Sequence, residues 1–172
     1  MTARELARMA MYVALFLVLD WVSGNLLPAM PQGGSLGLST IVLIIAAFDL
    51  GLIKSLFVVI LCLMLSFFTD PPYFVNFFQY FLDYVVGYAA YSLAAVLRNP
   101  RVDDRNIASY VLPILVPNVI RFFSSSLAGV LYYGVNWWGS FVYQSGYVIP
   151  TIVVTFLILP FLYPRLKPML KA

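Results

Sequence analysis

Two side chains of opposite charge interrupt long apolar runs of the sequence. Asp83 lies within QYFLDYVVGYAAYSLAAVLR (residues 79–98), and Arg121 lies within PNVIRFFSSSLAGVLYY (residues 117–133). A charge inside a membrane is unfavourable by several kcal/mol unless a partner or a polar cavity compensates for it. The two residues therefore predict either a facing ion pair or a shared polar cavity that binds a ligand.

Further polar side chains recur beside both charges at the spacing of one helical face. Those near Asp83 are Asn76, Gln79 and Tyr80, and Gly87 continues the same face. Those near Arg121 are Asn118, Ser125 and Tyr132, flanked by Ser124 and Ser126, and Tyr143, Gln144 and Tyr147 follow near the outer end of the last apolar run. Rings and hydroxyls clustered in this way favour a pocket for a flat molecule over an ion pair that only joins two helices. Asp20 is weaker evidence, because its place near the outer end of the first run is also compatible with a side chain that reaches the interface.

The composition places these residues in a membrane protein. Of the 172 residues, 63% are hydrophobic and 10% are charged, and the mean hydropathy is +0.94. A soluble domain of this length cannot bury so much apolar surface, because its interior is limited by its surface-to-volume ratio. The sequence has no histidine, which excludes His-based metal sites, and no GxxxxGK[ST] motif, which excludes a P-loop ATPase. We therefore expect no metal and no cofactor, and the scattered basic residues do not form the face that nucleic acid requires.

Six apolar segments meet or approach the roughly 20 residues that cross about 30 Å of hydrocarbon. They predict an all-α integral membrane bundle of six helices in a single transmembrane domain over residues 1–172. The expected helices cover about 5–27, 36–50, 52–68, 75–97, 107–133 and 141–163. The second segment must be short or tilted. Turn-forming or charged stretches such as TDPPY and RNPRVDDRN separate the segments.

Basic residues determine the orientation of this bundle. Apart from Arg121, every Lys and Arg lies toward one end of the predicted helices. Arg4 and Arg8 precede the apolar part of the first helix, and Lys54 follows the turn between the second and third. Arg98, Arg101 and Arg105 lie in the fourth connector, and Arg165, Lys167 and Lys171 follow the last helix. The positive-inside rule therefore places both termini in the cytoplasm. Tyr73, Trp137 and Trp138 then lie at the outer interface, where amphipathic rings are favoured. At 1.5 Å per residue, Asp83 lies about 12 Å and Arg121 about 18 Å below the outer surface, so the two can share one site.

Small residues recur near the N-terminus, in ARELARMAMYVAL. Ala10 and Ala14 form a small-xxx-small pair, and Ala3 and Ala7 precede it. Such a pair lets another helix approach closely within lipid. The pattern alone is equally compatible with packing inside the bundle and with docking of a partner protein.

The chain resembles the S components of energy-coupling factor (ECF) vitamin transporters, most closely their thiamine-binding branch. The resemblance rests on RMAMYVALF, TDPPYFVNFFQYFLDY, and RFFSSSLAGVLYY followed by WWGSFVYQSGY, and it extends over nearly the whole chain. It implies a six-helix protein of the bacterial plasma membrane that captures a vitamin from outside for ATP-driven uptake. The ATP is hydrolysed by a partner module of one transmembrane coupling protein and two ATPases, so the chain itself is not an enzyme.

The resemblance also implies roles for individual residues. Ala10 and Ala14, with Ala7 beside them, match an alanine motif that contacts the coupling protein. Asp83 and Arg121 stand where the thiamine-binding branch has an acidic and a basic residue that bind the pyrimidine ring. The other residues that we expect to bind substrate are Tyr73, Asn76, Gln79, Ser125, Tyr133 and Tyr143.

Several positions depart from the thiamine-binding pattern. Ser125 and Tyr133 stand in place of a histidine and a tryptophan, and Val148 in place of an asparagine. The stretch PQGGSLGLSTIVL (residues 31–43) has neither the carboxylate nor the aromatic ring that serve the cationic thiazolium of thiamine. We therefore expect hydroxymethylpyrimidine or pyridoxine as the ligand rather than thiamine.

Two other functions stay open at this point. A self-sufficient secondary carrier or channel would transport its substrate without an ATPase, although the sequence has no obvious inverted repeat of the kind found in many carriers. An intramembrane enzyme with Asp83 as general base is a weaker alternative. Such an enzyme would usually need a second carboxylate, metal ligands or an activated nucleophile beside Asp83. The adjacent carboxylates Asp103 and Asp104 lie in the cytoplasmic connector, far from Asp83 in depth.

Overall fold

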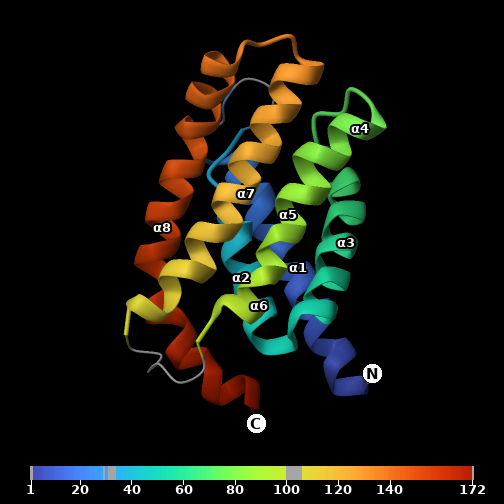
Figure 1. Cartoon of the computed structure of the whole chain (residues 1–172). Coiled ribbons are helices and arrows are strands. Elements are labelled where there is room, and N and C mark those ends of the chain that lie inside the picture. Colours follow the sequence, from blue (N-terminus) through green and yellow to red (C-terminus); the bar gives the residue numbers. More distant parts are fainter. Residues whose placement is uncertain (1, 29, 31–33, 100–105, 172) are drawn as a thin grey trace.

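The computed structural model describes residues 2–28, 30, 34–99 and 106–171, and it is a bundle of long helices (Figure 1). The elements are α1 (Ala3–Asn25), α2 (Ser39–Leu50), α3 (Leu52–Thr69), a helical stretch of changing type over Phe77–Leu97, α7 (Ala108–Tyr132) and α8 (Trp137–Lys171). All of them except α2 are long and apolar enough to cross a membrane. The prediction of an all-α membrane bundle is confirmed.

Helix α2 is the shortest of the predicted spans. Its 12 residues extend over about 18 Å, which is less than the thickness of the hydrocarbon core. It begins at Ser39 rather than near residue 36, and residues 39–47 are all buried. A helix that is apolar on every side is stable when other helices surround it, and α2 packs against α1, α3 and the stretch that contains residues 90–97.

Helix α8 is longer than the sequence predicts. It begins at Trp137 rather than near residue 141, and it continues to Lys171 rather than to about 163. The prediction ended where the apolar run ends, but Leu166 and Leu170 pack against the buried core and extend the helix beyond it. The helix accommodates four prolines: Pro150, Pro160, Pro164 and Pro168.

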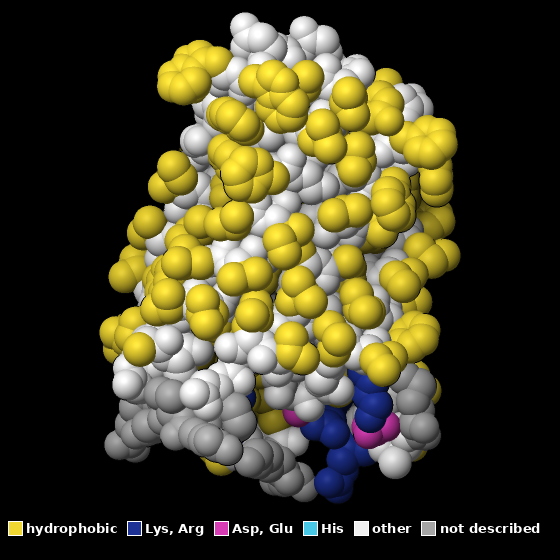
Figure 2. Space-filling model, viewed as in Figure 1, with side chains coloured by type: hydrophobic (Ala, Val, Ile, Leu, Met, Phe, Trp, Pro, Cys, Tyr) yellow, Lys and Arg dark blue, Asp and Glu magenta, His cyan; other side chains and the backbone are white. Residues whose placement is uncertain are grey.

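Both termini lie at the same end of the bundle (Figure 1). Figure 2 shows hydrophobic side chains over the flanks, whereas the charged side chains visible on that face lie at the end where the termini are. This distribution agrees with flanks that face lipid and with cytoplasmic termini. Arg101 and Arg105, on which the orientation also rested, lie outside the described residues, as do Asp103 and Asp104.

A polar network joins three helices at this cytoplasmic end. Nη1 of Arg8 lies 2.7 Å from Oδ1 of Asp49 and donates a second hydrogen bond, of 3.2 Å, to the carbonyl of Leu170. The hydroxyl of Tyr12 donates to Oδ2 of Asp49 at 3.0 Å. The network ties the start of α1 to the end of α2 and to the C-terminal turn of α8.

The small residues of α1 do not face the interior of the bundle. Ala7, Ala10 and Ala14 are exposed, whereas Met9 and Phe16 on the same helix are buried. Packing inside the bundle is therefore not their role. Their face of α1 is open to another helix.

The stretch from Phe77 to Leu97 changes helical type along its length. It passes through α4 (Phe77–Tyr80), a π-helical segment η2 (Phe81–Val86), α5 (Gly87–Ala89), a 3₁₀ segment η3 (Ala90–Leu93) and α6 (Ala94–Leu97). Insertion of a polar side chain from a neighbour is one recognised cause of such irregular turns. Here the hydroxyls of Ser124 and Ser125 on α7 donate to the backbone carbonyls of Leu82 and Asp83. The serine run of α7 thus supports the widened turn that carries Asp83.

Candidate ligand-binding site

The outer half of the bundle contains a cavity of about 290 Å³. Its walls come from α1, residues 34–35, the end of α3 and the residues after it, η2, α5, the outer half of α7 with the residues after it, and the first turns of α8. This volume is close to the lower end of the range for small-molecule sites. Asp83, Arg121, Tyr73, Tyr133 and Tyr143, all expected from the sequence to bind substrate, line this cavity.

The structure brings Asp83 and Arg121 into the same cavity but does not pair them. The salt bridges within 4.0 Å among the described residues lie at the cytoplasmic end, and neither includes Asp83 or Arg121. Arg121, which is 9% exposed, instead places its Cζ 4.5 Å from the ring centroid of Tyr88 and donates from Nη2 to the hydroxyl of Tyr88 at 3.3 Å. The direct ion pair is therefore wrong, and the shared polar cavity is the arrangement that the fold adopts. The cation–π contact with the ring and the hydrogen bond to the hydroxyl stabilise the buried guanidinium in place of an ion pair with a carboxylate.

Gln79 holds Asp83 in place. Its side chain is fully buried, accepts a hydrogen bond from the backbone N–H of Val75 at 3.1 Å, and donates to Oδ2 of Asp83 at 3.2 Å. Asn76 caps α4 by accepting from the backbone N–H of Gln79, and Ser125 donates to the backbone carbonyl of Asp83 at 3.4 Å. Gln79, Asn76 and Ser125 are absent from the described cavity wall. Gln79 and Ser125 instead contact Asp83, which does line the cavity, and Asn76 contacts Gln79.

Tyrosine rings form much of the cavity wall. Tyr84 and Tyr88 are parallel, with ring centroids 6.4 Å apart and an interplanar angle of 1°. Tyr73 and Tyr133 lie 5.7 Å apart, and the backbone N–H of Tyr73 donates to the hydroxyl of Tyr84 at 3.1 Å. The hydroxyl of Tyr143 accepts from the backbone N–H of Gly34 at 3.2 Å. These contacts connect the segments at residues 34 and 73 to the helices of the site.

Sequence reasoning missed Tyr84 and Tyr88 as wall residues. Their spacing of four residues, continued from Tyr80, is the signal that identifies them, because residues four apart share one helical face. The widened turn η2 shifts the face that points inward, so Asp83 and Tyr84, which are adjacent in the sequence, both line the cavity.

Two carboxylates that line the cavity were not among the residues that the sequence predicted to bind substrate. Asp20, which we expected to be compatible with a place at the membrane interface, lines the cavity and accepts a hydrogen bond from Ser39 at 2.8 Å. Asp70, the residue directly after α3, also lines the cavity, and burial raises the pKa of its carboxyl. The absence of a carboxylate from residues 31–43 therefore does not leave the cavity wall without carboxyl groups. The expectation that a cationic ring lacks a counter-charge rested on residues 31–43 alone and did not include these two side chains.

Comparison with known proteins agrees with this arrangement. The sequence model of the family described as thiamine transporter protein (Thia_YuaJ) matches residues 6–171. The chain is 25% identical to the thiamine transporter ThiT of Bacillus subtilis (strain 168) over 182 residues, which cover 98% of this chain and 94% of that protein. Its fold is similar to a solved structure of ThiT from Listeria monocytogenes, with a TM-score of 0.67 and 19% identity over 95% of this chain and 97% of the other.

The family match extends over nearly all of the chain, including every helix that forms the cavity. It confirms the resemblance to the thiamine-binding branch of the ECF S components and identifies a multi-pass membrane protein of vitamin transport rather than an enzyme. The chain therefore belongs to the thiamine transporter protein family.

Proposed function

We propose that this protein is the substrate-binding S component of an ECF-type transporter and that thiamine is its substrate. The cavity of the outer half would capture the vitamin from outside. A partner module of one transmembrane coupling protein and two ATPases would then drive its release into the cytoplasm. The observation that carries the proposal is a tyrosine-walled cavity in which a guanidinium and several carboxylates lie together.

The charges of the cavity favour thiamine over the ligands first expected from the sequence. Hydroxymethylpyrimidine and pyridoxine were favoured because residues 31–43 lack a carboxylate. Asp20 and Asp70 supply carboxylates from other parts of the chain. A cavity with negative charge and aromatic walls suits a ligand that carries a positively charged ring.

Arg121 and Asp83 are the polar anchors in this proposal. A guanidinium remains charged at any physiological pH and offers several donors in a fixed plane, so it can hold a ring nitrogen and an aromatic neighbour at once. Asp83 can accept a hydrogen bond from an amino group of the ligand. Tyr73, Tyr133 and Tyr143 would enclose the ligand, while Ser125, Asn76 and Gln79 hold the anchors in position.

The exposed alanine face of α1 is the proposed contact with the coupling protein. Ala7, Ala10 and Ala14 present almost no side-chain bulk, so a partner helix can approach the backbone of α1 closely. The same helix contributes Phe16 and Asp20 to the cavity wall. Helix α1 would therefore contact the ligand and the coupling protein at the same time.

Binding to the detergent-purified protein tests the substrate. Native mass spectrometry of the protein as isolated would identify any small molecule that co-purifies, and calorimetric titration would then compare thiamine, hydroxymethylpyrimidine and pyridoxine. We expect thiamine to bind most tightly. Tighter binding of either neutral ligand, or binding of none of the three, would overturn the proposed substrate.

Uptake into liposomes separates the S-component proposal from the secondary-carrier alternative. We expect thiamine accumulation only when the protein is reconstituted with an ECF module and ATP is supplied on the module side. Accumulation by the protein alone, without ATP, would instead support a self-sufficient carrier.

A further inference from the structure

The described wall of the cavity contains more acidic than basic side chains. Its described wall includes the carboxylates of Asp20, Asp70 and Asp83 and one guanidinium, that of Arg121. None of these four residues takes part in a salt bridge within 4.0 Å among the described residues. Carboxylates that are removed from water without a cationic partner are unfavourable, so a ligand of positive charge would compensate for them.

One stripe of α1 faces the cavity. Phe16, Asp20 and Gly24 follow one another at intervals of four residues, which places them on the same side of the helix, and all three line the cavity. Phe16 is 1% exposed and packs edge-on against Tyr88, with ring centroids 5.8 Å apart. Asp20 thus stands on α1 between an aromatic ring and a glycine.

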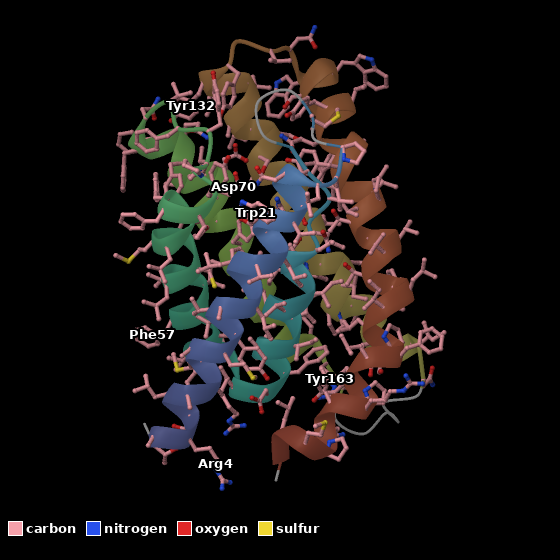
Figure 3. The ribbon with its side chains drawn as sticks, turned by 180° about the vertical axis from the view of Figure 1, so that it is seen from behind. Arg4, Trp21, Phe57, Asp70, Tyr132 and Tyr163 are labelled. Carbon is pink, nitrogen blue, oxygen red and sulfur yellow. The ribbon has the colours of Figure 1, made fainter. Side chains whose placement is uncertain are left out.

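Gly24 makes room for the second carboxylate. A Cβ atom placed on Gly24 would lie 2.2 Å from Oδ2 of Asp70, a distance that real atoms do not reach. The carboxylate of Asp70 therefore lies directly against the backbone of α1, one turn beyond Asp20, and Figure 3 shows Asp70 beside the outer end of this helix. The fold brings two carboxylates from α1 and from the end of α3 to one side of the cavity.

Neither carboxylate forms a salt bridge within 4.0 Å with the described residues. Asp20 accepts one hydrogen bond, from the uncharged hydroxyl of Ser39, and Asp70 accepts none from the described residues. Arg121 is directed to the ring and hydroxyl of Tyr88, and its buried Nε has no hydrogen-bond partner. The cavity wall thus holds carboxylates and a guanidinium that form no salt bridge within 4.0 Å among the described residues, so the cationic part of a ligand would supply the missing partner for the carboxylates.

We propose that Asp20 and Asp70 form the subsite for the positively charged part of the ligand. This inference rests on the proposed function and assigns the cationic ring of the vitamin to the α1 side of the cavity. Phe16 and Tyr84 line the same cavity and provide aromatic surface that a cationic ring contacts favourably. Asp83 and Arg121 then remain for the neutral, hydrogen-bonding ring.

A pair of ligands of the same shape but different charge tests this subsite. The probes are thiamine and the analogue in which a neutral thiophene ring replaces the thiazolium, each titrated calorimetrically into the purified full-length protein. We expect the wild-type protein to prefer thiamine. Asp20→Asn and Asp70→Asn should each weaken thiamine binding by about tenfold or more while changing the affinity for the neutral analogue by less than about twofold.

Control variants separate charge from folding. Asp70→Glu keeps the charge and should retain most of the preference for thiamine, whereas Glu5→Gln removes a carboxylate at the cytoplasmic end and should leave both affinities unchanged. The thermal melting temperature of each variant verifies that it is folded. Gly24→Ala provides a second approach, because the added methyl group displaces the carboxylate of Asp70 without changing any charge; it should reduce the preference for thiamine as Asp70→Asn does.

The outcomes distinguish this inference from the proposed function. If wild-type protein binds thiamine and its neutral analogue equally, or if Asp20→Asn and Asp70→Asn weaken both ligands to the same extent, the cationic subsite is wrong while thiamine remains the substrate. If wild-type protein does not bind thiamine at all, the proposed substrate and the subsite are both wrong.

Discussion

The guanidinium of Arg121 lies over the ring of Tyr88, with Cζ 4.5 Å from the ring centroid, and the two side chains are both buried. The Tyr88 ring holds the guanidinium inside the bundle without a carboxylate within 4.0 Å among the described residues. Nη2 donates to the Tyr88 hydroxyl, and Arg121 also lines the cavity, so a permanently charged side chain stands at the proposed ligand site.

Replacing Arg121 with Met is expected to weaken thiamine binding by about 10- to 100-fold, which corresponds to about 1.4–2.8 kcal/mol. The substitution preserves most of the buried volume but removes every donor. Titration calorimetry on the purified protein measures the effect. Tyr88→Phe is the matched control, since it keeps the ring under the guanidinium and removes only the hydroxyl, and it should cost less than about tenfold. Unchanged affinity of the Met variant would exclude Arg121 from the site.

Replacing Gln79 with Ala is expected to weaken thiamine binding through Asp83, although Gln79 does not line the cavity. The change removes the 3.2 Å hydrogen bond to Oδ2 of Asp83 and leaves the carboxylate free to turn. We expect a loss of about three- to tenfold, smaller than that of Asp83→Asn. The double variant tests the connection: if Gln79 acts through Asp83, its removal should have almost no further effect once Asp83 is Asn. Additive losses would mean that Gln79 acts independently.

Thiamine affinity is expected to fall on acidification earlier than an ordinary carboxyl would predict. Burial raises the pKa of Asp70 above the usual value of about 3.9, so this carboxylate loses its charge as the pH falls through that raised pKa. In the absence of ligand, the stability of the folded protein depends on pH in the opposite direction to the affinity for thiamine. The folded protein binds this proton more tightly than the unfolded chain, so the contribution of Asp70 to the free energy of unfolding decreases as the pH rises through the same range.

The pH dependence is measured by titrating thiamine at a series of pH values below 7. Asp70→Asn should reduce the dependence of thiamine affinity on pH. The dependence that remains would come from Asp20 and Asp83, which line the same cavity with Arg121. Identical curves for the wild-type protein and the Asn variant would show that Asp70 is not titrated in the binding step.

Replacing Ala10 or Ala14 with Trp is expected to prevent assembly with the ECF module without changing thiamine affinity. Both alanines are exposed on α1, on a face from which the buried residues of the helix point away, so a large side chain there blocks a close helix contact but leaves the cavity intact. Co-purification with the module and calorimetric titration measure the two effects separately. Leu157→Trp, at an exposed position on α8, is the control for added bulk on a lipid-facing surface. Normal assembly of both alanine variants would place the module elsewhere.

Replacing Asp49 with Asn is expected to lower stability without affecting ligand binding. The substitution removes the charge that pairs with Arg8 at 2.7 Å and weakens the hydrogen bond from Tyr12. Because the Asp49 side chain is only 7% exposed, we expect a loss of about 1–3 kcal/mol in the free energy of unfolding. Thermal unfolding in detergent measures the loss, and Lys54→Gln, which breaks the more exposed pair with Glu5, should have a smaller effect. A change in thiamine affinity would connect this network to the cavity.

The sequence by itself was sufficient for the class of the protein and its fold, and it predicted the general place of the site. Placing polar groups in lipid is unfavourable, and this accounts for the apolar runs of membrane length and for the one-sided distribution of Lys and Arg. The effect acts on each segment independently of the others, so it can be recognised in the sequence. For the same reason, Asp83 and Arg121 could be identified as functional candidates from their positions within such runs. Their comparable depth followed from the rise per residue of a helix alone.

Only the tertiary structure decided how these groups meet. Whether Asp83 pairs with Arg121 depends on the widened turn η2, on the hydroxyls that Ser124 and Ser125 present to it, and on the ring of Tyr88, and these contacts lie between helices distant in sequence. Asp20 and Asp70 are separated by 50 positions and come together because Gly24 lets the end of α3 approach α1. The sequence shows which residues share one face of a helix. It does not show how two helices are rotated relative to each other or how closely they pack, so the acidic and basic residues that meet in the cavity could be identified only from the fold.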